Sequence, residues 1–136
     1  MGDWELMPTT VRVLVVDDQA PFRMAAAAVL RRLEGFELVG EAGGGRDAIL
    51  LADELLPDLV LMDINMPEMS GIEATRLIVA DHPDVVVILC STYEFADLPP
   101  EAATSGARAY FNKEGLGADR LRQLWEDRHS AAFVAH

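Results

Sequence analysis

The sequence predicts a doubly wound α/β domain built on a five-stranded parallel sheet. Five short apolar runs alternate with segments of helical composition along nearly the whole chain. Strands that alternate with helices of about ten residues form right-handed βαβ units, which build parallel sheets. The runs are apolar almost throughout and lack the period of two of a half-exposed strand. We therefore expect helices on both faces of the sheet.

The predicted strands are short and rich in β-branched or aromatic residues, which favour extended structure. The first has the sequence VRVLVV, and the fourth, VVVILCS, is the most strand-like segment of the chain. In chain order, we predict strands at Val11–Val16, Phe36–Glu41, Asp58–Asp63, Val85–Ser91 and Arg108–Asn112.

The predicted helices are bounded by capping residues and prolines. Asp18, Gln19 and Pro21 precede the first helix, which is rich in Ala, Leu and Arg, and we expect its Met24 to face the core. Proline removes a backbone donor, so the pair at positions 99 and 100 makes the fourth helix start late or be interrupted. We predict helices at Phe22–Leu33, Arg46–Leu56, Ile72–Ala80, Glu101–Ser105 and Ala118–His129.

Length and charge limit the number of domains and the kinds of partner. The chain has 136 residues, the size of one domain: we assign 1–10 to an N-terminal extension, 11–129 to the domain and 130–136 to a C-terminal tail. The net charge of −12 argues against binding to nucleic acid or to an anionic membrane. No apolar run approaches the ~20 residues of a membrane span, and no basic secretory signal is present. We expect a cytoplasmic location.

Reactive polar residues stand at the ends of four predicted strands. Asp17 and Asp18 follow the first strand, and Asp63 ends the third. Ser91 ends the fourth strand, and Lys113 follows the fifth. Ligands of open α/β sheets bind beyond the carboxyl ends of the strands. In the strand order 2-1-3-4-5, the first and third strands are neighbours, so the carboxylates of the three aspartates should share one crevice. The Ser91 hydroxyl and the Lys113 ammonium should lie on its rim.

Three carboxylates in one crevice repel one another, and a bound divalent cation would relieve the repulsion. Oxygen ligands that leave room for water suit Mg²⁺, and a phosphate oxygen often completes its coordination shell. Phosphoryl transfer depends mainly on positioning and electrostatics, so a carboxylate nucleophile, a metal, a hydroxyl and a lysine are sufficient for it. Each residue alone would be an ordinary cap, strand-end hydroxyl or surface lysine. Their common place at the strand ends favours a function.

Four motifs occur at these strand ends: VVDDQ, LMDINMPEMSG, ILCST and GARAYFNK. Together they resemble the receiver domain of two-component response regulators, over about residues 11 to 127. The resemblance implies a flavodoxin-like fold and a phosphoryl group received from the phosphohistidine of a sensor histidine kinase. It also implies that the domain signals by changing conformation.

The resemblance implies a role for each matching residue. Asp63 corresponds to the phospho-acceptor. Asp18 corresponds to a direct metal ligand, whereas Asp17 acts mainly through a bound water. The backbone carbonyl of Asn65 corresponds to a further metal ligand. With Asp63 itself, these residues form the expected Mg²⁺ site.

The remaining matches concern the phosphoryl group and the switch. Ser91 corresponds to the hydroxyl that hydrogen-bonds the phosphoryl group, and Lys113 to the lysine that pairs with the acceptor and then with a phosphoryl oxygen. Tyr110 resembles the aromatic residue whose rotamer follows the hydroxyl, although a packing role explains it equally well. Asn65 and Tyr93 occupy the two positions associated with the dephosphorylation rate.

Several alternatives stay open at this point. A pseudo-receiver would bind a partner through the same fold without being phosphorylated. A metal-dependent phosphatase needs a second acid near the nucleophile, and Asn65 cannot supply its proton, so we do not expect a turnover enzyme. Output requires a downstream protein partner, unless the chain is a fragment that lacks an output domain. The proline pair alters a face that often dimerises in the family, so a homodimer stays open but is not assumed. Glu114 replaces the usual proline after Lys113, and its carboxylate either engages Lys113 or points to solvent.

Overall fold

The computed structural model describes residues 10–130 and 133–135. The strands are β1 (Val11–Val16), β2 (Phe36–Ala42), β3 (Leu59–Asp63), β4 (Val86–Ser91), β5 (Ala109–Asn112) and β6 (Val134–Ala135). The helices are α1 (Ala20–Arg32), α2 (Gly45–Leu55), α3 (Gly71–Asp81) and α4 (Ala118–Glu126), with the short 3₁₀ helices η2 (Phe95–Asp97), η3 (Pro100–Ala102) and η4 (Lys113–Gly115).

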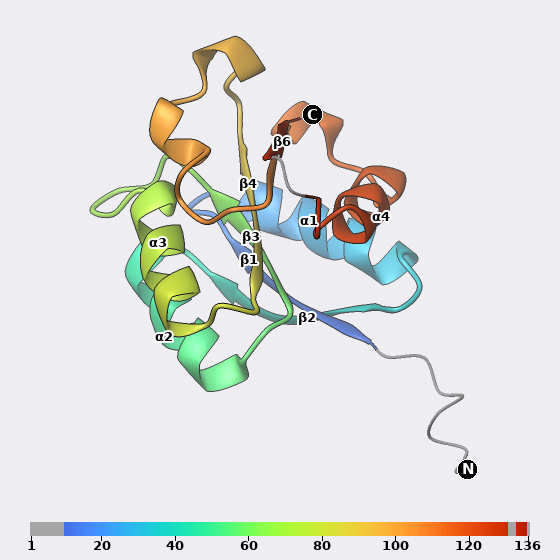
Figure 1. Ribbon diagram of the computed structural model, residues 1–136. Coiled ribbons are helices and arrows are strands. Elements are labelled where there is room, and N and C mark those ends of the chain that lie inside the picture. Colours follow the sequence, from blue (N-terminus) through green and yellow to red (C-terminus); the bar gives the residue numbers. More distant parts are fainter. Residues whose placement is uncertain (1–9, 131–132, 136) are drawn as a thin grey trace.

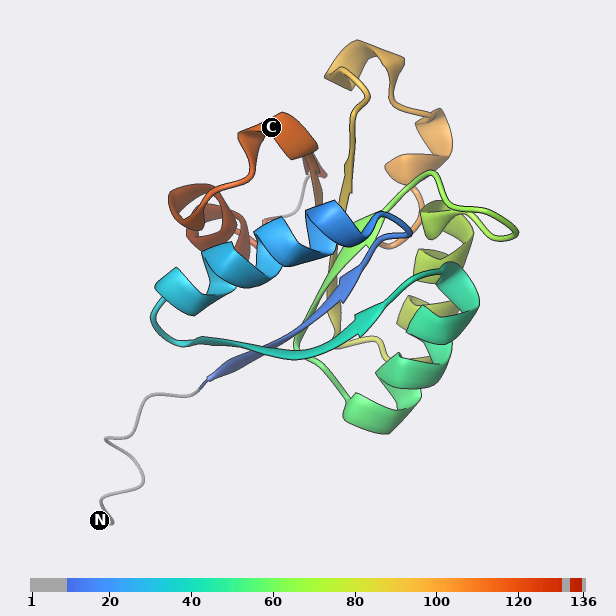
Figure 2. The ribbon, with the colours of Figure 1, turned by 180° about the vertical axis from the view of Figure 1, so that it is seen from behind.

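All strands of the sheet are parallel, in the order β2-β1-β3-β4-β5-β6. The predicted order of the first five strands is confirmed. The chain passes over β1 between β2 and β3, so the sheet order reverses there and the carboxyl ends of β1 and β3 become neighbours. Helices α1 and α4 cover one face of the sheet, and α2 and α3 cover the other (Figure 1; Figure 2, from behind).

Each face of the sheet has its own hydrophobic core, because successive strand residues point to opposite faces. In β1, Val13 and Val15 pack toward α1 and α4, whereas Leu14 and Val16 pack toward α2 and α3. Both sets are fully buried, which explains why β1 is apolar without alternation. Ala26, Ala27 and Leu30 form the buried side of α1, and Met24, which we expected to face the core, is 71% exposed.

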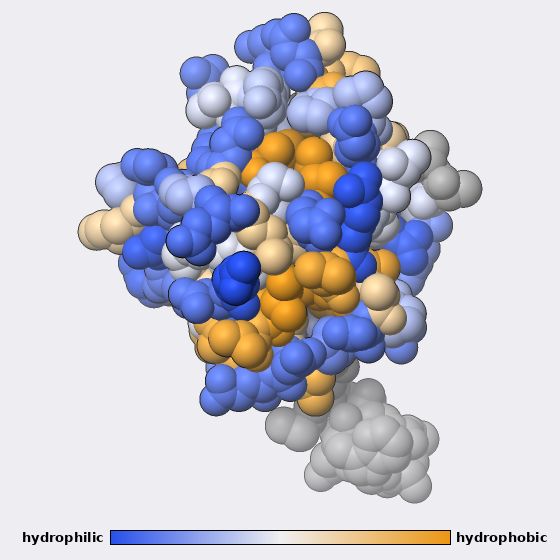
Figure 3. All heavy atoms as spheres, turned by 90° about the vertical axis from the view of Figure 1, so that its left-hand side faces the viewer, coloured by the Kyte–Doolittle hydropathy of each residue, from blue (hydrophilic) through white to orange (hydrophobic). Residues whose placement is uncertain are grey.

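The α2 and α3 side is mainly hydrophilic, with smaller apolar areas between the polar residues (Figure 3). Exposed large apolar residues of these helices and their ends include Leu50, Leu56 and Leu77. Among residues 10–130 and 133–135, no helix combines the length and the apolar character that spanning a membrane requires.

The segment between β4 and β5 contains no α-helix, so the predicted helix at Glu101–Ser105 is wrong. The two 3₁₀ helices η2 and η3 occupy this segment, with Pro99 preceding η3 and Pro100 at its first position. Neither proline can donate a backbone hydrogen bond, so a regular helix cannot continue through them. The predicted interruption is confirmed.

The C-terminal part extends the sheet by a sixth strand. Helix α4 ends at Glu126 rather than at His129, and Val134–Ala135 pairs with Ala109 and Tyr110 of β5. We predicted a tail over 130–136, and residues 131, 132 and 136 of it lie outside the described residues. The predicted N-terminal extension also lies outside them, apart from Thr10.

Candidate functional site

The structure brings three acidic side chains together at the carboxyl ends of β1 and β3. Oxygen atoms of Asp17, Asp18 and Asp63 all lie within 4.8 Å of one another. Asp17 is fully buried and Asp63 is 3% exposed, whereas Asp18 is half-buried. The crevice expected from the strand order is therefore present, with one acid open to solvent.

The turn after β1 holds Asp17 in place. The Asp17 backbone N–H donates to Ala42 O at the end of β2, and Asp17 Oδ1 accepts from the Gln19 N–H at 2.8 Å. Gln19 precedes the first residue of α1, but its side chain does not cap the helix. Arg23 Nη1 donates to Asp17 O at 2.6 Å. One oxygen of Asp17 thus orders the turn, and the other, Oδ2, faces the crevice.

The turn between β3 and α3 holds Asp63. The Gly71 N–H donates to Ile64 O at 2.8 Å, and Ser70 Oγ caps α3 by accepting from the Glu73 N–H. A Cβ atom on Gly71 would lie 1.8 Å from the backbone oxygen of Asp63. Only glycine fits this close approach, so the MSG sequence is needed for the position of the acceptor.

Lys113 supplies the positive charge of the crevice, and it is the only lysine of the sequence. Its Nζ lies 2.6 Å from Asp17 Oδ2 and 3.2 Å from Asp63 Oδ1. Asp17 Oδ2 is buried and receives no well-aligned hydrogen bond, so the ammonium is its main compensation. Glu114, which could have engaged this lysine, is exposed, and its N–H donates to Asn112 Oδ1.

The pKa values at the site reflect burial and like charges. Burial is the largest cause that raises the pKa of Asp63 to about 6, followed by the charge of Asp17, against the opposing effect of Lys113. Burial by itself would lower the pKa of Lys113, but its close contacts with the carboxylates of Asp17 and Asp63, and their negative charges, raise that pKa above its usual value. Near neutral pH, these values favour a charged lysine beside an acceptor that is mostly ionised.

Ser91 and Tyr110 form a buried pair beside the crevice. Their hydroxyl oxygens are 2.8 Å apart, and Tyr110 also donates to Tyr93 O at 2.6 Å. The Tyr93 N–H donates to Ser91 Oγ at 3.1 Å. Since the tyrosine proton is used on Tyr93 O, the Ser91 hydroxyl donates to Tyr110. Burial also raises the pKa of Tyr110, so its hydroxyl keeps this proton.

Asn65 and Tyr93 lie on two loops at the rim of the site. Tyr93 OH donates to Asn65 Oδ1 over a long 3.4 Å, which links the loop after β3 to the loop after β4. Asn65 is exposed and follows the acceptor by two positions, but the role of its carbonyl as a metal ligand stays a prediction.

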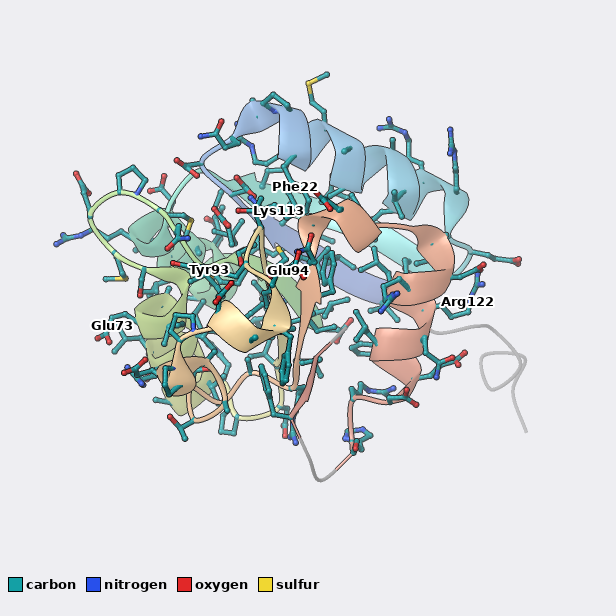
Figure 4. All side chains as sticks on the ribbon, turned by 90° about the horizontal axis from the view of Figure 1, so that it is seen from above. Phe22, Glu73, Tyr93, Glu94, Lys113 and Arg122 are labelled. Atoms are coloured by element: carbon teal, nitrogen blue, oxygen red, sulfur yellow. The ribbon has the colours of Figure 1, made fainter. Side chains whose placement is uncertain are left out.

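Two neighbours of the site were absent from the predicted set. Asn112 Nδ2 donates to Tyr93 O at 3.0 Å and so joins β5 to the loop after β4. The ring of Phe22 lies 4.7 Å from Lys113 Nζ, at the carboxyl end of the sheet (Figure 4). Phe22 stands in the first turn of α1, close after the acidic pair in sequence, which is the signal that could have indicated it.

These features agree with comparisons to known proteins. The chain belongs to the response regulator receiver domain family, whose model matches residues 13–126. It is 39% identical to the response regulator GacA of Pseudomonas aeruginosa, over 83% of this chain and 52% of GacA. It is 43% identical to the transcriptional regulatory protein PdtaR of Mycobacterium tuberculosis, over 75% of this chain and 49% of PdtaR. It therefore spans about half the length of these relatives.

Solved structures show the same fold. A LuxR-family response regulator from Aurantimonas superposes with a TM-score of 0.81 at 28% identity, covering 93% of this chain and 89% of that one. The response regulator domain of Thermotoga maritima CheB superposes with a TM-score of 0.74 at 35% identity, covering 90% and 96%. The chain is thus a receiver domain of two-component signalling with a flavodoxin-like fold.

Proposed function

We propose that the chain receives a phosphoryl group on Asp63 from a sensor histidine kinase, with Mg²⁺ bound beside it. The observation that carries this proposal is the buried acceptor, with the Lys113 ammonium at 3.2 Å and two further acids within 4.8 Å. A carboxylate oxygen of Asp63 attacks phosphorus, and the phosphorus–nitrogen bond of the donor phosphohistidine breaks. The electron pair of that bond stays on the histidine ring, which takes up a proton.

The residues present fit a magnesium ion. Asp18 offers a partly exposed carboxylate, and Asp17, whose Oδ2 also pairs with Lys113, offers a buried carboxylate for the expected contact through a bound water. With Asp63 and the carbonyl of Asn65, they form an oxygen-only donor set, which Mg²⁺ prefers. When bound, the ion supplies positive charge to the transferred phosphoryl group.

Lys113 and Ser91 act on the phosphoryl group after transfer. The ammonium already contacts the acceptor, so it needs little movement to pair with a phosphoryl oxygen. The phosphoryl oxygens compete with Tyr110 for the Ser91 proton, because phosphorylation adds strong acceptors and roughly −1.5 to −2 charge. Loss of the bond between Ser91 and Tyr110 would loosen the loop after β4, which Tyr93 links to both residues.

We infer that the output is a protein contact rather than turnover of a substrate. The loop after β4 and the adjoining η2 carry the exposed Phe95, which a downstream protein or an output domain could contact. The chain is a phosphoryl acceptor that controls such a partner, and we assign it no role as a turnover enzyme. A metal-dependent phosphatase needs a second acid near its nucleophile as a proton donor, and Asn65, two positions after the acceptor, cannot supply that proton.

Intact-mass spectrometry after incubation with Mg²⁺ and acetyl phosphate tests the proposal. Wild type should gain about 80 Da, the mass of one phosphoryl group. Asp63→Asn should gain nothing. Asp84→Asn is the matched control, because Asp84 is an exposed acid before β4, at the opposite end of the strands. A folded wild type that stays unlabelled would indicate a pseudo-receiver that acts by binding alone.

A further inference from the structure

The charged group of Lys113 is enclosed on several sides. Its side chain is 16% exposed, and two carboxylates approach Nζ, from Asp17 and from Asp63. The ring of Phe22 covers a further side, with its centroid 4.7 Å from the nitrogen. Figure 4 shows both residues at the same end of the sheet, Phe22 from α1 and Lys113 from the segment after β5. A cation over an aromatic face is attracted to it, and more strongly where water is excluded.

The ring is held by its own packing. Phe22 is half-buried and packs against the core between the sheet and the α1 and α4 helices. Pro21 stands beside it at the start of α1, and the Phe22 N–H donates to Gln19 O at 3.1 Å. Lys113, in contrast, has a flexible four-carbon stem and begins the short η4 helix. The rigid partner of the pair is therefore the ring.

We propose that Phe22 is a positioning residue that keeps the Lys113 ammonium at the acceptor, an inference that rests on the proposed phosphoryl transfer. The ring attracts the charge without accepting an N–H bond in a fixed direction. The ammonium donors stay available for oxygen atoms, first those of Asp17 and Asp63 and then those of the phosphoryl group. Without the ring, water reaches that side of the ammonium, and the stem can swing away.

Phe22→Leu removes the aromatic face and keeps an apolar side chain, whereas Phe22→Tyr keeps the face. Phe36→Leu is the matched control, because Phe36 packs against the same core but contacts Trp125 instead of Lys113. We expect Phe22→Leu to label with acetyl phosphate about 3- to 30-fold more slowly than wild type. Phe22→Tyr and Phe36→Leu should stay within about twofold of wild type.

The position of the ammonium can be measured directly by nitrogen NMR. Because the sequence has one lysine, selective ¹⁵N-lysine labelling yields a single side-chain ammonium signal. We expect this signal to be shifted by the ring and protected from exchange with water in wild type, in Phe22→Tyr and in Phe36→Leu. In Phe22→Leu the ring-induced shift disappears together with the ring, so the deciding readout is exchange, and the ammonium protons should exchange fast with water. This readout needs no phosphorylation and would not respond to a purely structural role of Phe22.

The outcomes separate the two proposals. Ammonium protons that stay equally protected from exchange in Phe22→Leu, or an equal loss of protection in Phe36→Leu, overturn the positioning role. If Phe22→Leu fails to fold, a fluorinated phenylalanine at position 22 keeps the shape and weakens the ring face, and an unchanged signal there overturns the inference as well. A wild type that is never labelled, with the ammonium signal still dependent on the ring, would refute the phosphoryl transfer and retain the positioning.

Discussion

The carboxylate of Asp63 is unfavourable for the folded state, so Asp63→Asn should stabilise the protein when no metal is bound. Burial and the charge of Asp17 raise the pKa of Asp63 from 3.8 to about 6 on folding. An acid with a raised pKa binds more protons in the folded state than in the unfolded state. Stability therefore falls as the pH rises from about 4 to about 6, and the asparagine escapes this loss.

The size of the effect follows from the pKa values. The difference between 3.8 and about 6 corresponds to roughly 3 kcal/mol at pH 7. At pH 4.5, folded Asp63 already carries its proton, so the advantage of asparagine shrinks to about 1 kcal/mol. Lys113 keeps Asp17 as its nearer partner in the variant, which limits the loss from the broken ion pair.

Urea unfolding in EDTA at both pH values measures this difference for wild type, Asp63→Asn and the control Asp84→Asn. The control should match wild type at each pH, because Asp84 is exposed. Equal stability of wild type and Asp63→Asn at pH 7 would refute the reasoning, as would a gain of the same size at pH 4.5. Added Mg²⁺ should reduce the stability difference between wild type and Asp63→Asn, because it binds and stabilises folded wild type. At a Mg²⁺ concentration a hundred times its dissociation constant from wild type, this stabilisation is about 3 kcal/mol.

Three further substitutions test the site and its supports. Asp18→Asn should abolish most of the Mg²⁺-dependent rise in melting temperature, and a full rise in this variant would exclude Asp18 as a ligand. Gly71→Ala should lower the unfolding free energy by more than about 3 kcal/mol, because its Cβ meets backbone at 1.8 Å, whereas Gly115→Ala, with open space, should cost under about 1 kcal/mol. Tyr110→Phe should cost about 1 kcal/mol in urea unfolding, because the Ser91 hydroxyl and the Tyr93 carbonyl oxygen each lose a hydrogen-bond partner. Tyr93→Phe, which removes only a long contact to Asn65, should cost less.

The fold was predictable because its signals are local or topological. An apolar strand that is buried on both faces, such as Val11–Val16, needs helices on both faces of the sheet, whichever segments of the chain supply them. The right-handed crossover rule then limits the strand orders, and the reversal beside β1 brings Asp17 near Asp63. The motifs at the strand ends indicated the same residues independently.

Other features depend on packing that no local pattern reports. Met24 is a large apolar residue of the kind that cores contain, but Ala26, Ala27 and Leu30 form the side of α1 that packs against the sheet, and Met24 lies outside that side. The pairing of Val134–Ala135 with β5 is a long-range contact of a segment too short to show a strand period. The proline pair predicted a broken helix, but not that two 3₁₀ helices replace it.

The sequence by itself determined the strands and the polar residues that end them, because apolar runs and strand-end positions are properties of the chain alone. The resemblance of its motifs to receiver domains then indicated that these residues share one acidic crevice. The tertiary structure decided the contacts within that crevice. It showed that Lys113 lies closer to Asp17 than to Asp63, that Phe22 covers the ammonium, and that the Ser91 hydroxyl is engaged by Tyr110. Such contacts join side chains from different elements, and their distances depend on how helices and loops settle on the sheet, which no spacing in the sequence encodes.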